Sequence, residues 1–323
     1  MVDNLFPDGR FRDDEFRDDL LRDDLPRDGR AGIDAALVGR LVRAQFPQWG
    51  ALPVRPVAVD GWDNRTYRLG DTMTVRLPTA AAYDPAVEKE HRWLPVLAAE
   101  LPVAVPPVLA LGAPGEGYPH PWSVRGWLEG ESANRRPLDD LPGFAVGVGE
   151  FVLALQRVDA TGGPGAGAHS FHRGAPPAHY DGETRRALAA LAGRVDTVRA
   201  EAVWEAALAA TRQGSPVWFH GDIAGGNLLV RDGKLAAVID FGTSGTGDPA
   251  CDLVIAWTMF ADGSRQAFRE TVGQDRGTWA RARGWALWKS LICLAQFLDE
   301  DPAQAAEHRR VLDEVLADHE LFG

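Results

Sequence analysis

The segment 218–243, WFHGDIAGGNLLVRDGKLAAVIDFGT, places His220, Asp222, Asn227 and Asp240 at the edges of an apolar hairpin pattern. His220, Asp222 and Asn227 follow the spacing H-x-D-x-x-x-x-N, and Asp240 stands in IDFG. An amide oxygen and a carboxylate are hard oxygen ligands of the kind that Mg²⁺ takes. A further carboxylate beside such a metal can reach a hydroxyl that attacks a phosphoryl group. The chemistry that these residue types and spacings favour is therefore phosphoryl transfer.

A β-hairpin is the element that would bring the metal ligands together. Residues 227–242 read NLLVRDGKLAAVIDFG, and Asp232-Gly233 at their centre is a strong signal for a two-residue hairpin turn. Because a hairpin returns to its starting point, Asn227 and Asp240 are expected to lie near one another. A capped turn followed by an ordinary hairpin end is the structural alternative for the whole set.

Upstream of the hairpin, alternating apolar residues and glycine turns predict a small antiparallel sheet. VRPVAVDGWDNRTYRLGDTMTVRLPT reads as strand, turn, strand, turn, strand, with turns at Gly61 and at Gly70-Asp71. Pro95 falls inside a helical pattern and should kink or divide that helix. The elements expected in this part are a helix over 33–47, three strands over 54–79, a helix over 83–101 and two strands over 105–133.

The chain becomes largely helical after residue 140. A Gly/Pro-rich loop over 161–182 and a short apolar strand before His220 interrupt the helices, which resume at 249 and end near Leu321. This layout predicts an α+β fold with two lobes, a small antiparallel-β lobe and a larger α-helical lobe with one embedded hairpin. The expected domains are a tail over 1–32, an N-lobe over 33–130 and a C-lobe over 131–323.

The tail and the composition limit the classes of partner. Arg recurs every five residues between 12 and 27, each time followed by Asp, which matches neither helix nor strand and predicts a disordered or loosely helical tail. A capture arm for a partner is the alternative. The net charge of −12 disfavours nucleic acid and anionic membranes; it is compatible with a cationic small molecule, or with solubility alone.

The remaining bulk features favour the cytoplasm. No apolar run approaches the length needed to span a bilayer, and the acidic start lacks the pattern of a secretory signal. Cys251 and Cys293 lie in apolar, helix-like segments and are expected to be buried small hydrophobes. The acidic run 299–301 is either a solvated helix end or a contact for a cationic acceptor.

These motifs carry a resemblance to a known family. HGD, the following Asn, IDFG and GDPACDL together resemble the aminoglycoside phosphotransferase family, whose fold is protein-kinase-like. DNRTYRLGDTMTVRLP, EKEHRWLPVLA, GYPHPWSVRGWLEGE and FHRGAPPAHYDGETRRAL are similar to that family too, so the resemblance covers roughly residues 35–320. It implies Mg²⁺-dependent transfer of the γ-phosphoryl group of ATP, or of GTP, to a hydroxyl of a small molecule.

The resemblance leaves the acceptor open. An aminoglycoside or another antibiotic-like molecule is the first expectation, and choline, homoserine and sugar kinases of the same fold are the alternatives. A nucleotide-binding protein without transfer activity is the rival from another class. A protein kinase is disfavoured, because the compact link from Asp240 to GDPACDL leaves little room for a peptide-positioning loop.

The resemblance also implies roles in the catalytic loop. Asp222 would be the catalytic base that orients the acceptor hydroxyl, with His220 in the same loop more as a brace than as a substrate contact. Asn227 and Asp240 would hold Mg²⁺. Asp252, in GDPACDL, would buttress the loop.

On the nucleotide side, Arg76 stands where the kinase-like fold has its nucleotide-binding Lys on the third strand. Arg keeps the charge, but its planar fork is not a Lys ammonium. Glu90 in the following helix would pair with Arg76; a surface ion pair is the alternative. The segment 124–128 resembles the hinge that contacts the base edge. The residues expected around the base are Trp127, Leu128, Leu229 and Ile239.

Overall fold

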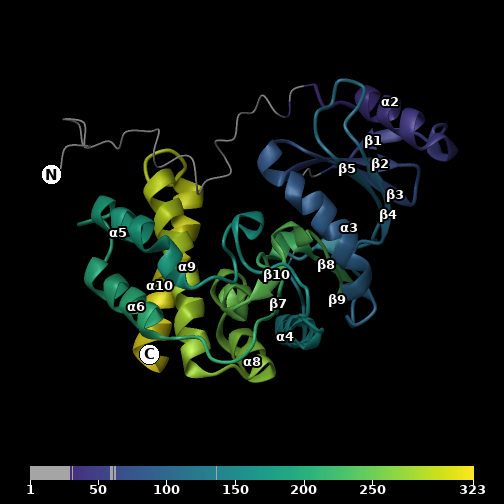
Figure 1. Ribbon diagram of the computed structural model, residues 1–323. Coiled ribbons are helices and arrows are strands. Elements are labelled where there is room, and N and C mark those ends of the chain that lie inside the picture. Colours follow the sequence, from purple (N-terminus) through teal and green to yellow (C-terminus); the bar gives the residue numbers. More distant parts are fainter. Residues whose placement is uncertain (1–29, 31, 59–60, 62, 136) are drawn as a thin grey trace, which may run out of the picture. The chain divides into compact units, whose positions relative to one another are not determined.

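The computed structural model describes residues 30, 32–58, 61, 63–135 and 137–323, drawn in Figure 1. The RDD repeat of the expected tail lies outside these residues. The chain forms two compact units. The first contains residues up to His91 together with Val108–Trp127, and the second contains Arg92–Pro107 and Leu128–Gly323. That residues 33–130 bind nucleotide and residues 131–323 bind the acceptor remains a prediction.

The first unit is built on a five-stranded antiparallel sheet with the order β1-β2-β3-β5-β4. β2 and β3 pair along their whole length, and Gly70 in the turn between them has a φ of 59°, a left-handed value that suits glycine. The strands are β1 (Val54–Pro56), β2 (Asn64–Leu69), β3 (Met73–Pro78), β4 (Val108–Gly112) and β5 (Trp122–Gly126). The predicted antiparallel sheet is confirmed.

Helix α2 (Ala35–Gln45) packs on this sheet and contributes to its core. Asp34 caps the helix by accepting a hydrogen bond of 2.8 Å from the Leu37 N–H. The apolar face of α2 packs against side chains of β2, β3 and β5. The buried members of this core are Ile33, Leu37, Val38, Leu41, Val42, Tyr67, Leu69, Met73, Val75, Leu77, Tyr118, Trp122 and Val124.

Helix α3 (Asp84–Ala98) starts in the first unit and ends in the second. Its first turn holds Asp84 and Pro85, which suit the positive, donor-rich start of a helix. Pro95 does not divide the helix, contrary to one expectation. Because Pro95 lies in the last turn, only the bond that its missing N–H would have made to His91 is lost.

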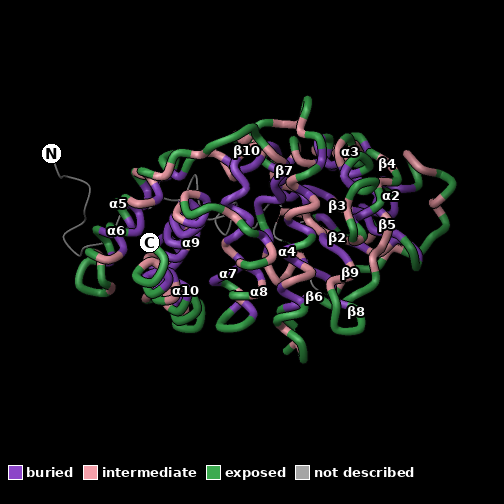
Figure 2. Tube along the Cα trace, turned by 90° about the horizontal axis from the view of Figure 1, so that it is seen from below, coloured by how far each residue is buried: buried purple, intermediate pink, exposed green. Residues whose placement is uncertain are grey.

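The second unit is mainly helical, and α9 forms its centre. α9 is buried on nearly every side, as Figure 2 shows, and α10 packs along it. Throughout the described part of the chain, every helix is too short or too polar to traverse a bilayer. The α-helices are α4 (Leu141–Arg157), α5 (Asp181–Ala190), α6 (Thr197–Ala209), α7 (Ile255–Thr258), α8 (Asp262–Val272), α9 (Arg276–Phe297) and α10 (Pro302–Phe322). Cys251 and Cys293 are both buried, as predicted.

The predicted hairpin is present in the second unit. β8 (Leu228–Arg231) and β9 (Lys234–Val238) are joined by Asp232-Gly233, both with positive φ, the geometry that this dipeptide favours in a hairpin. β6 (Glu131–Ser132) adds a third strand beside β8. A separate pair, β7 (Val217–Phe219) with β10 (Gly245–Gly247), lies next to the loop that carries His220 and Asp222. The α+β fold with a β-rich and a helix-rich unit is therefore confirmed.

Candidate active site

The loop after β7 is held through its backbone by one buried carboxylate. Asp252, in the 3₁₀-helix η9 (Pro249–Val254), accepts hydrogen bonds of 2.8 Å from His220 N–H and 2.6 Å from Gly221 N–H. Asp252 is fully buried, and burial raises the pKa of its carboxyl, while the two backbone N–H groups act in the opposite direction. The buttressing contact that the resemblance implied is thus confirmed.

His220 is also fully buried, and its ring makes two contacts within the loop. Its Nε2 lies 3.0 Å from the Ile239 carbonyl oxygen, and its Nδ1 accepts a hydrogen bond of 3.2 Å from the Asp222 N–H. The carbonyl needs a donor and the N–H needs an acceptor, so both contacts fit the neutral ring protonated on Nε2. His220 therefore braces the two segments that carry Asp222 and Asp240.

Gly221 is required where the loop turns. Its φ is +84°, and an added Cβ would lie 2.9 Å from the Thr243 carbonyl oxygen and 3.1 Å from the Arg173 Cβ. A side chain would meet both the strain of a left-handed backbone and a clash with the Thr243 backbone oxygen. The glycine in HGD thus lets the chain pass between these neighbours and present the next residue, Asp222, to solvent.

Asp222 and Asn227 contact each other directly. The Asn227 Nδ2 donates to the Asp222 carboxylate oxygen Oδ2 at 2.8 Å and to the Asp222 carbonyl oxygen at 3.0 Å. Asp222 is exposed, so its carboxylate can accept a hydrogen bond from an incoming hydroxyl. Since Nδ2 is occupied by these donations, the Asn227 amide has its oxygen available as a metal ligand.

Asp240 directly follows Ile239, at the end of the hairpin that begins after Asn227. The Ile239 N–H donates to the Asn227 carbonyl oxygen at 2.9 Å, which fixes the residues that flank the open end of the hairpin. Asp240 has φ 66° and ψ 64°, a left-handed conformation that is strained for a non-glycine residue. Strain of this kind persists only where the surrounding structure enforces it, and it concentrates at functional sites.

The oxygen ligands that Asn227 and Asp240 offer fit a magnesium ion better than a metal that is coordinated only by protein side chains. Within the described ranges, no three His, Cys, Asp or Glu side chains gather as a metal-binding group. Mg²⁺ is usually held by one or two carboxylates together with water and substrate phosphates. One carboxylate, Asp240, and one amide oxygen, Asn227, match that pattern, and they match poorly the nitrogen and sulfur ligands that Zn²⁺ prefers.

In the first unit, Arg76 and Glu90 form the expected pair. The Arg76 Nη1 lies 3.4 Å from the Glu90 Oε1, and the side chains are only 15% and 5% exposed, so the pair is not a surface ion pair. A second guanidinium, that of Arg125 on β5, donates through Nη2 to the Glu90 Oε2 at 3.2 Å. One carboxylate is therefore shared by two arginines.

The residues expected around the base fall on both units. Trp127 ends the first unit and Leu128 begins the second. Trp127 is half-buried; its N–H donates to the Thr72 carbonyl oxygen at 2.8 Å, and the Arg68 guanidinium stacks 3.9 Å from its ring centroid. Leu229 on β8 is buried and Ile239 after β9 is half-buried, both in the second unit. A shared base pocket built from these residues remains a prediction.

Comparison with known protein families gives the same enzyme class as the motifs. The model of the phosphotransferase enzyme family, APH, matches residues 54–285, which is well over half of the chain. The chain belongs to this phosphotransferase family. The match spans both Arg76 and the catalytic loop, so the enzyme class rests on both units. Curated proteins include no match to this chain.

Solved structures show the same kinase-like fold. An aminoglycoside 2'-phosphotransferase-IIIa in complex with GDP is 18% identical, with a TM-score of 0.65 over 88% of this chain and 99% of that one. The macrolide 2'-phosphotransferase MphH from Brachybacterium faecium is 22% identical, with a TM-score of 0.54 over 87% and 98%. The ADP-bound aminoglycoside phosphotransferase APH(2'')-Ib is 14% identical, with a TM-score of 0.56 over 88% and 97%.

Two buried arginines of this phosphotransferase were missed from the sequence. Arg125 lies inside the predicted hinge, where its charge in an apolar strand was the available signal. Arg281 on α9 donates to both oxygens of buried Asp248, from Nε at 2.6 Å and from Nη2 at 3.2 Å. Asp248 is the first aspartate of the segment GDPACDL, and Asp252 is the second. This ion pair therefore attaches that segment to the central helix α9.

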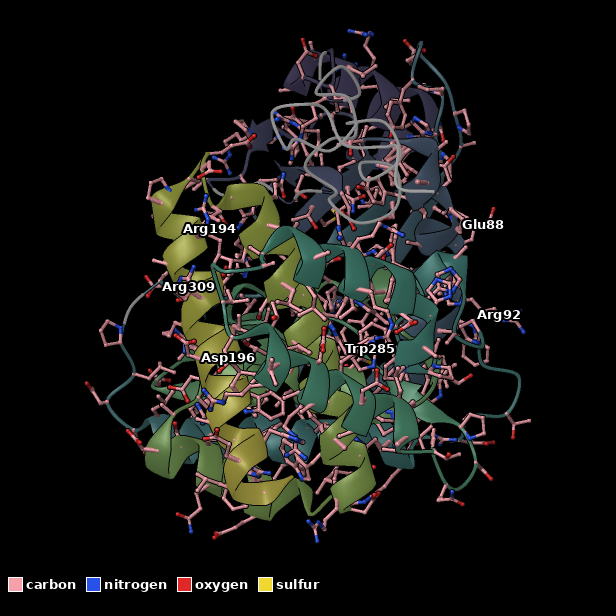
Figure 3. The ribbon with its side chains drawn as sticks, turned by 90° about the vertical axis from the view of Figure 1, so that its left-hand side faces the viewer. Glu88, Arg92, Arg194, Asp196, Trp285 and Arg309 are labelled. Atoms are coloured by element: carbon pink, nitrogen blue, oxygen red, sulfur yellow. The ribbon has the colours of Figure 1, made fainter. Side chains whose placement is uncertain are left out.

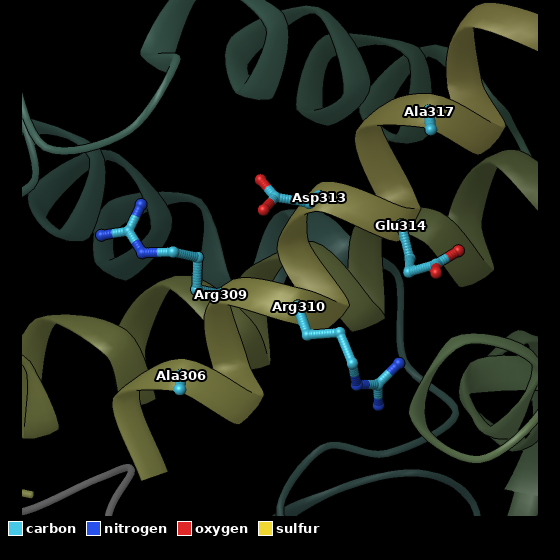
Figure 4. Close-up of a pocket in the computed structure, with 6 residues that line it drawn as sticks. All are labelled: Ala306, Arg309, Arg310, Asp313, Glu314 and Ala317. Carbon is cyan, nitrogen blue, oxygen red and sulfur yellow. The ribbon is translucent and has the colours of Figure 1, made fainter. Parts of the chain in front are cut away.

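The surface of α10 holds a hollow of about 500 Å³, shown in Figure 4, that is separate from the predicted site residues. Its lining residues are Ala306, Arg309, Arg310, Asp313, Glu314 and Ala317. Several of its charges already have partners: Arg310 pairs with Glu307, Glu314 pairs with Arg265, and Arg309 donates to the Arg194 carbonyl oxygen at 3.0 Å (Figure 3). None of the lining residues is among the predicted site residues.

The acidic run before α10 has a structural role. Asp301 caps the helix by accepting hydrogen bonds from Ala303 N–H at 3.0 Å and Gln304 N–H at 3.1 Å. An aspartate at this position satisfies backbone donors that the helix itself leaves unpaired. The helix-end interpretation therefore accounts for this member of the run.

Proposed function

We propose that this phosphotransferase moves the γ-phosphoryl group of ATP or GTP to a hydroxyl of a small, antibiotic-like acceptor, in a Mg²⁺-dependent reaction. One observation carries the proposal. The carboxylate of exposed Asp222 is oriented by the amide of Asn227, and the preceding residues His220 and Gly221 are held by hydrogen bonds to Asp252 and Ile239. An exposed carboxylate on a rigid loop is what general base catalysis requires.

In this proposal, Asp222 accepts a hydrogen bond from the acceptor hydroxyl and takes its proton as the hydroxyl oxygen attacks phosphorus. His220 and Asp252 contact neither substrate; they fix the position of the Asp222 backbone. Most of the rate enhancement in phosphoryl transfer comes from positioning and charge stabilisation, so this rigidity contributes directly to rate.

Asn227 and Asp240 would hold Mg²⁺ through one amide oxygen and one carboxylate. When bound, the metal would neutralise charge on the nucleotide phosphates. The left-handed backbone of Asp240 supports this role, because the fold maintains a strained conformation at that carboxylate.

Arg76 would bind the nucleotide phosphates, with Glu90 holding its guanidinium in place. The hinge residues Trp127 and Leu128 would contact the edge of the base, and Leu229 and Ile239 would form the floor of its pocket. The solved relatives support nucleotide use: their titles name complexes with GDP, ADP and ATP.

An aminoglycoside is the first acceptor to test. Solved structures of similar fold are complexes with kanamycin, gentamicin and streptomycin, and two others are macrolide phosphotransferases. The net charge of −12 supports a cationic acceptor over a neutral one, since an acidic surface attracts cations. Macrolides, choline and small sugars form the comparison set.

The test is release of nucleoside diphosphate from Mg²⁺-ATP and Mg²⁺-GTP across aminoglycosides, macrolides, choline and sugars. We expect release that depends on one acceptor class and falls about 10³-fold in Asp222→Asn, a loss typical of removing a general base. Asp232→Asn is the matched control, because it makes the same change at the exposed turn of the adjacent hairpin and keeps a residue that favours this turn. Equal rates in the two variants would overturn the proposal.

A further inference from the structure

Arg125 lies in the segment predicted as the hinge, but its side chain has no role so far and reaches toward the predicted phosphate-binding residue. On the sheet, Arg76 of β3 stands opposite Ser123 of β5, and Arg125 is two residues beyond Ser123. Side chains two residues apart on a strand share a face, so the sheet register brings Arg76 and Arg125 to the same face. Glu90 reaches that face from α3 and binds one arginine with each carboxylate oxygen.

We propose that Arg125 is a positioning residue for nucleotide binding that acts through Glu90 on Arg76. The inference rests on the proposed role of Arg76 in binding phosphates, and it says which residue keeps Arg76 in position for that role. Arg125 itself would not contact the nucleotide.

Burial separates the roles of the two arginines. The side chains of Arg76, Glu90 and Arg125 are 15%, 5% and 1% exposed. The Arg125 Nε also donates to the Ser123 hydroxyl at 3.2 Å, which fixes its guanidinium from a second side. Arg76 is thus the most exposed of the three side chains, whereas Arg125 is too deeply buried to contact a ligand.

Charge explains what the second arginine adds. With one arginine, the Glu90 carboxylate could bind the planar fork of Arg76 through both oxygens and neutralise it, because this bidentate geometry is strongly favoured. Arg125 occupies one of the two oxygens. Together, the two guanidinium groups and the carboxylate carry one net positive charge, which favours an anion such as a nucleoside diphosphate at Arg76.

The experiment measures equilibrium binding of Mg²⁺-ADP by calorimetry, so it needs no acceptor and no turnover. We expect Arg76→Met to weaken binding about 100-fold and Arg125→Met about 10-fold, losses in the range of coupled charge pairs. In the Arg76→Met background, Arg125→Met should cause no further loss, because Arg125 acts only through Arg76. Arg125→Lys should recover most of the affinity, because it keeps the charge.

Arg55→Met is the matched control: it removes an exposed arginine of β1, paired with exposed Asp71, and should leave the dissociation constant unchanged. If Arg125→Met does not fold, Ser123→Ala removes only the second contact of Arg125 and should weaken binding by about 3-fold. An unchanged constant in folded Arg125→Met, or an equal loss in the Arg76→Met background, would overturn the inference.

This outcome is distinguishable from failure of the proposed function. If Arg125 has no role, the wild type still binds Mg²⁺-ADP and still transfers phosphate. If the proposed function is wrong, the wild type shows no acceptor-dependent release of diphosphate, whatever the binding constants of the Arg125 variants.

Discussion

The two units hold their candidate site residues by different means. In the second unit, the loop that presents Asp222 is fixed mainly through its backbone, by hydrogen bonds from His220 and Gly221 to Asp252. In the first unit, charged side chains fix one another, with Glu90 between two arginines. Substitutions that break the Asp252 contacts should therefore displace the proposed catalytic base. Substitutions of Glu90 should instead remove a buried carboxylate from two arginines.

The first unit should show the largest effect on stability. Glu90→Gln removes the carboxylate that Arg76 and Arg125 share and leaves two guanidinium groups without it in a buried site. Breaking a buried ion pair in this way costs about 3–5 kcal/mol of unfolding free energy. Denaturant titration measures the loss, with Glu88→Gln as the control, because Glu88 is an exposed neighbour on the same helix (Figure 3). A loss within 1 kcal/mol of the control would contradict this account of the first unit.

The second unit should show its largest effect in rate. Asp252→Asn replaces one of the two acceptor oxygens with a donor, so either His220 N–H or Gly221 N–H loses its partner. A small displacement of the loop would follow, and displacements of about 1 Å can cost about 100-fold in kcat. We expect that fall in kcat with a nearly unchanged KM for the nucleotide. A variant that remains folded and keeps its kcat would show that Asp252 does not position the loop.

The N-cap of the central helix α9 should affect stability without affecting activity, because it belongs to neither group of candidate site residues. Asp275 begins α9 and accepts hydrogen bonds from the Thr278 hydroxyl at 2.6 Å and the Thr278 N–H at 3.0 Å. The hydroxyl contact lowers the pKa of Asp275 below its ordinary value. A carboxyl with a lowered pKa in the folded state stabilises the protein above its unfolded pKa of about 4, and this stabilisation disappears as the pH falls through the folded pKa.

Asp275→Asn should therefore lower the unfolding free energy by about 0.5 kcal/mol at pH 7, since its remaining oxygen still caps the helix while the charge near the helix start is lost. The Thr278 hydroxyl can rotate and accept a hydrogen bond from the new amide. The difference from the wild type should shrink as the pH drops below about 4. Thermal unfolding at several pH values measures it, and kcat at pH 7 should not change. A difference that grows on acidification would have the wrong sign for a lowered pKa.

The catalytic loop was largely predictable from sequence, because its geometry is local. H-x-D-x-x-x-x-N, the Asp-Gly turn and IDFG lie on one loop and one hairpin, and the hairpin geometry follows from the turn residues. Asp252 was also predictable, but only through the resemblance to a family, since nothing in its spacing shows that it bonds back to Gly221. The two-lobed α+β fold followed from the change from alternating to helical patterns.

The first unit was less predictable, because its contacts join distant elements. Arg76 and Glu90 were paired by resemblance, whereas Arg125 depended on the register of β5 against β3, which no short-range pattern specifies. The pairing of Arg281 was not predictable for a similar reason: Arg281 lies in an apolar helix, and its partner Asp248 is distant in the sequence. Pro95 was expected to kink or divide its helix, because proline disfavours helix interiors. It lies in the last turn of α3, and the helix is not divided.

The central claim is that Asp222 is the base that receives the acceptor's proton. The most direct measurement follows a radioactive label from the γ-phosphate of ATP, or of GTP, into the acceptor found in the diphosphate-release assay, in Asp222→Asn and in Asp232→Asn. The account predicts labelled acceptor at the wild-type rate in Asp232→Asn and about 10³-fold slower in Asp222→Asn, with Mg²⁺-nucleotide affinity unchanged in both. Labelling at the wild-type rate in Asp222→Asn would contradict it.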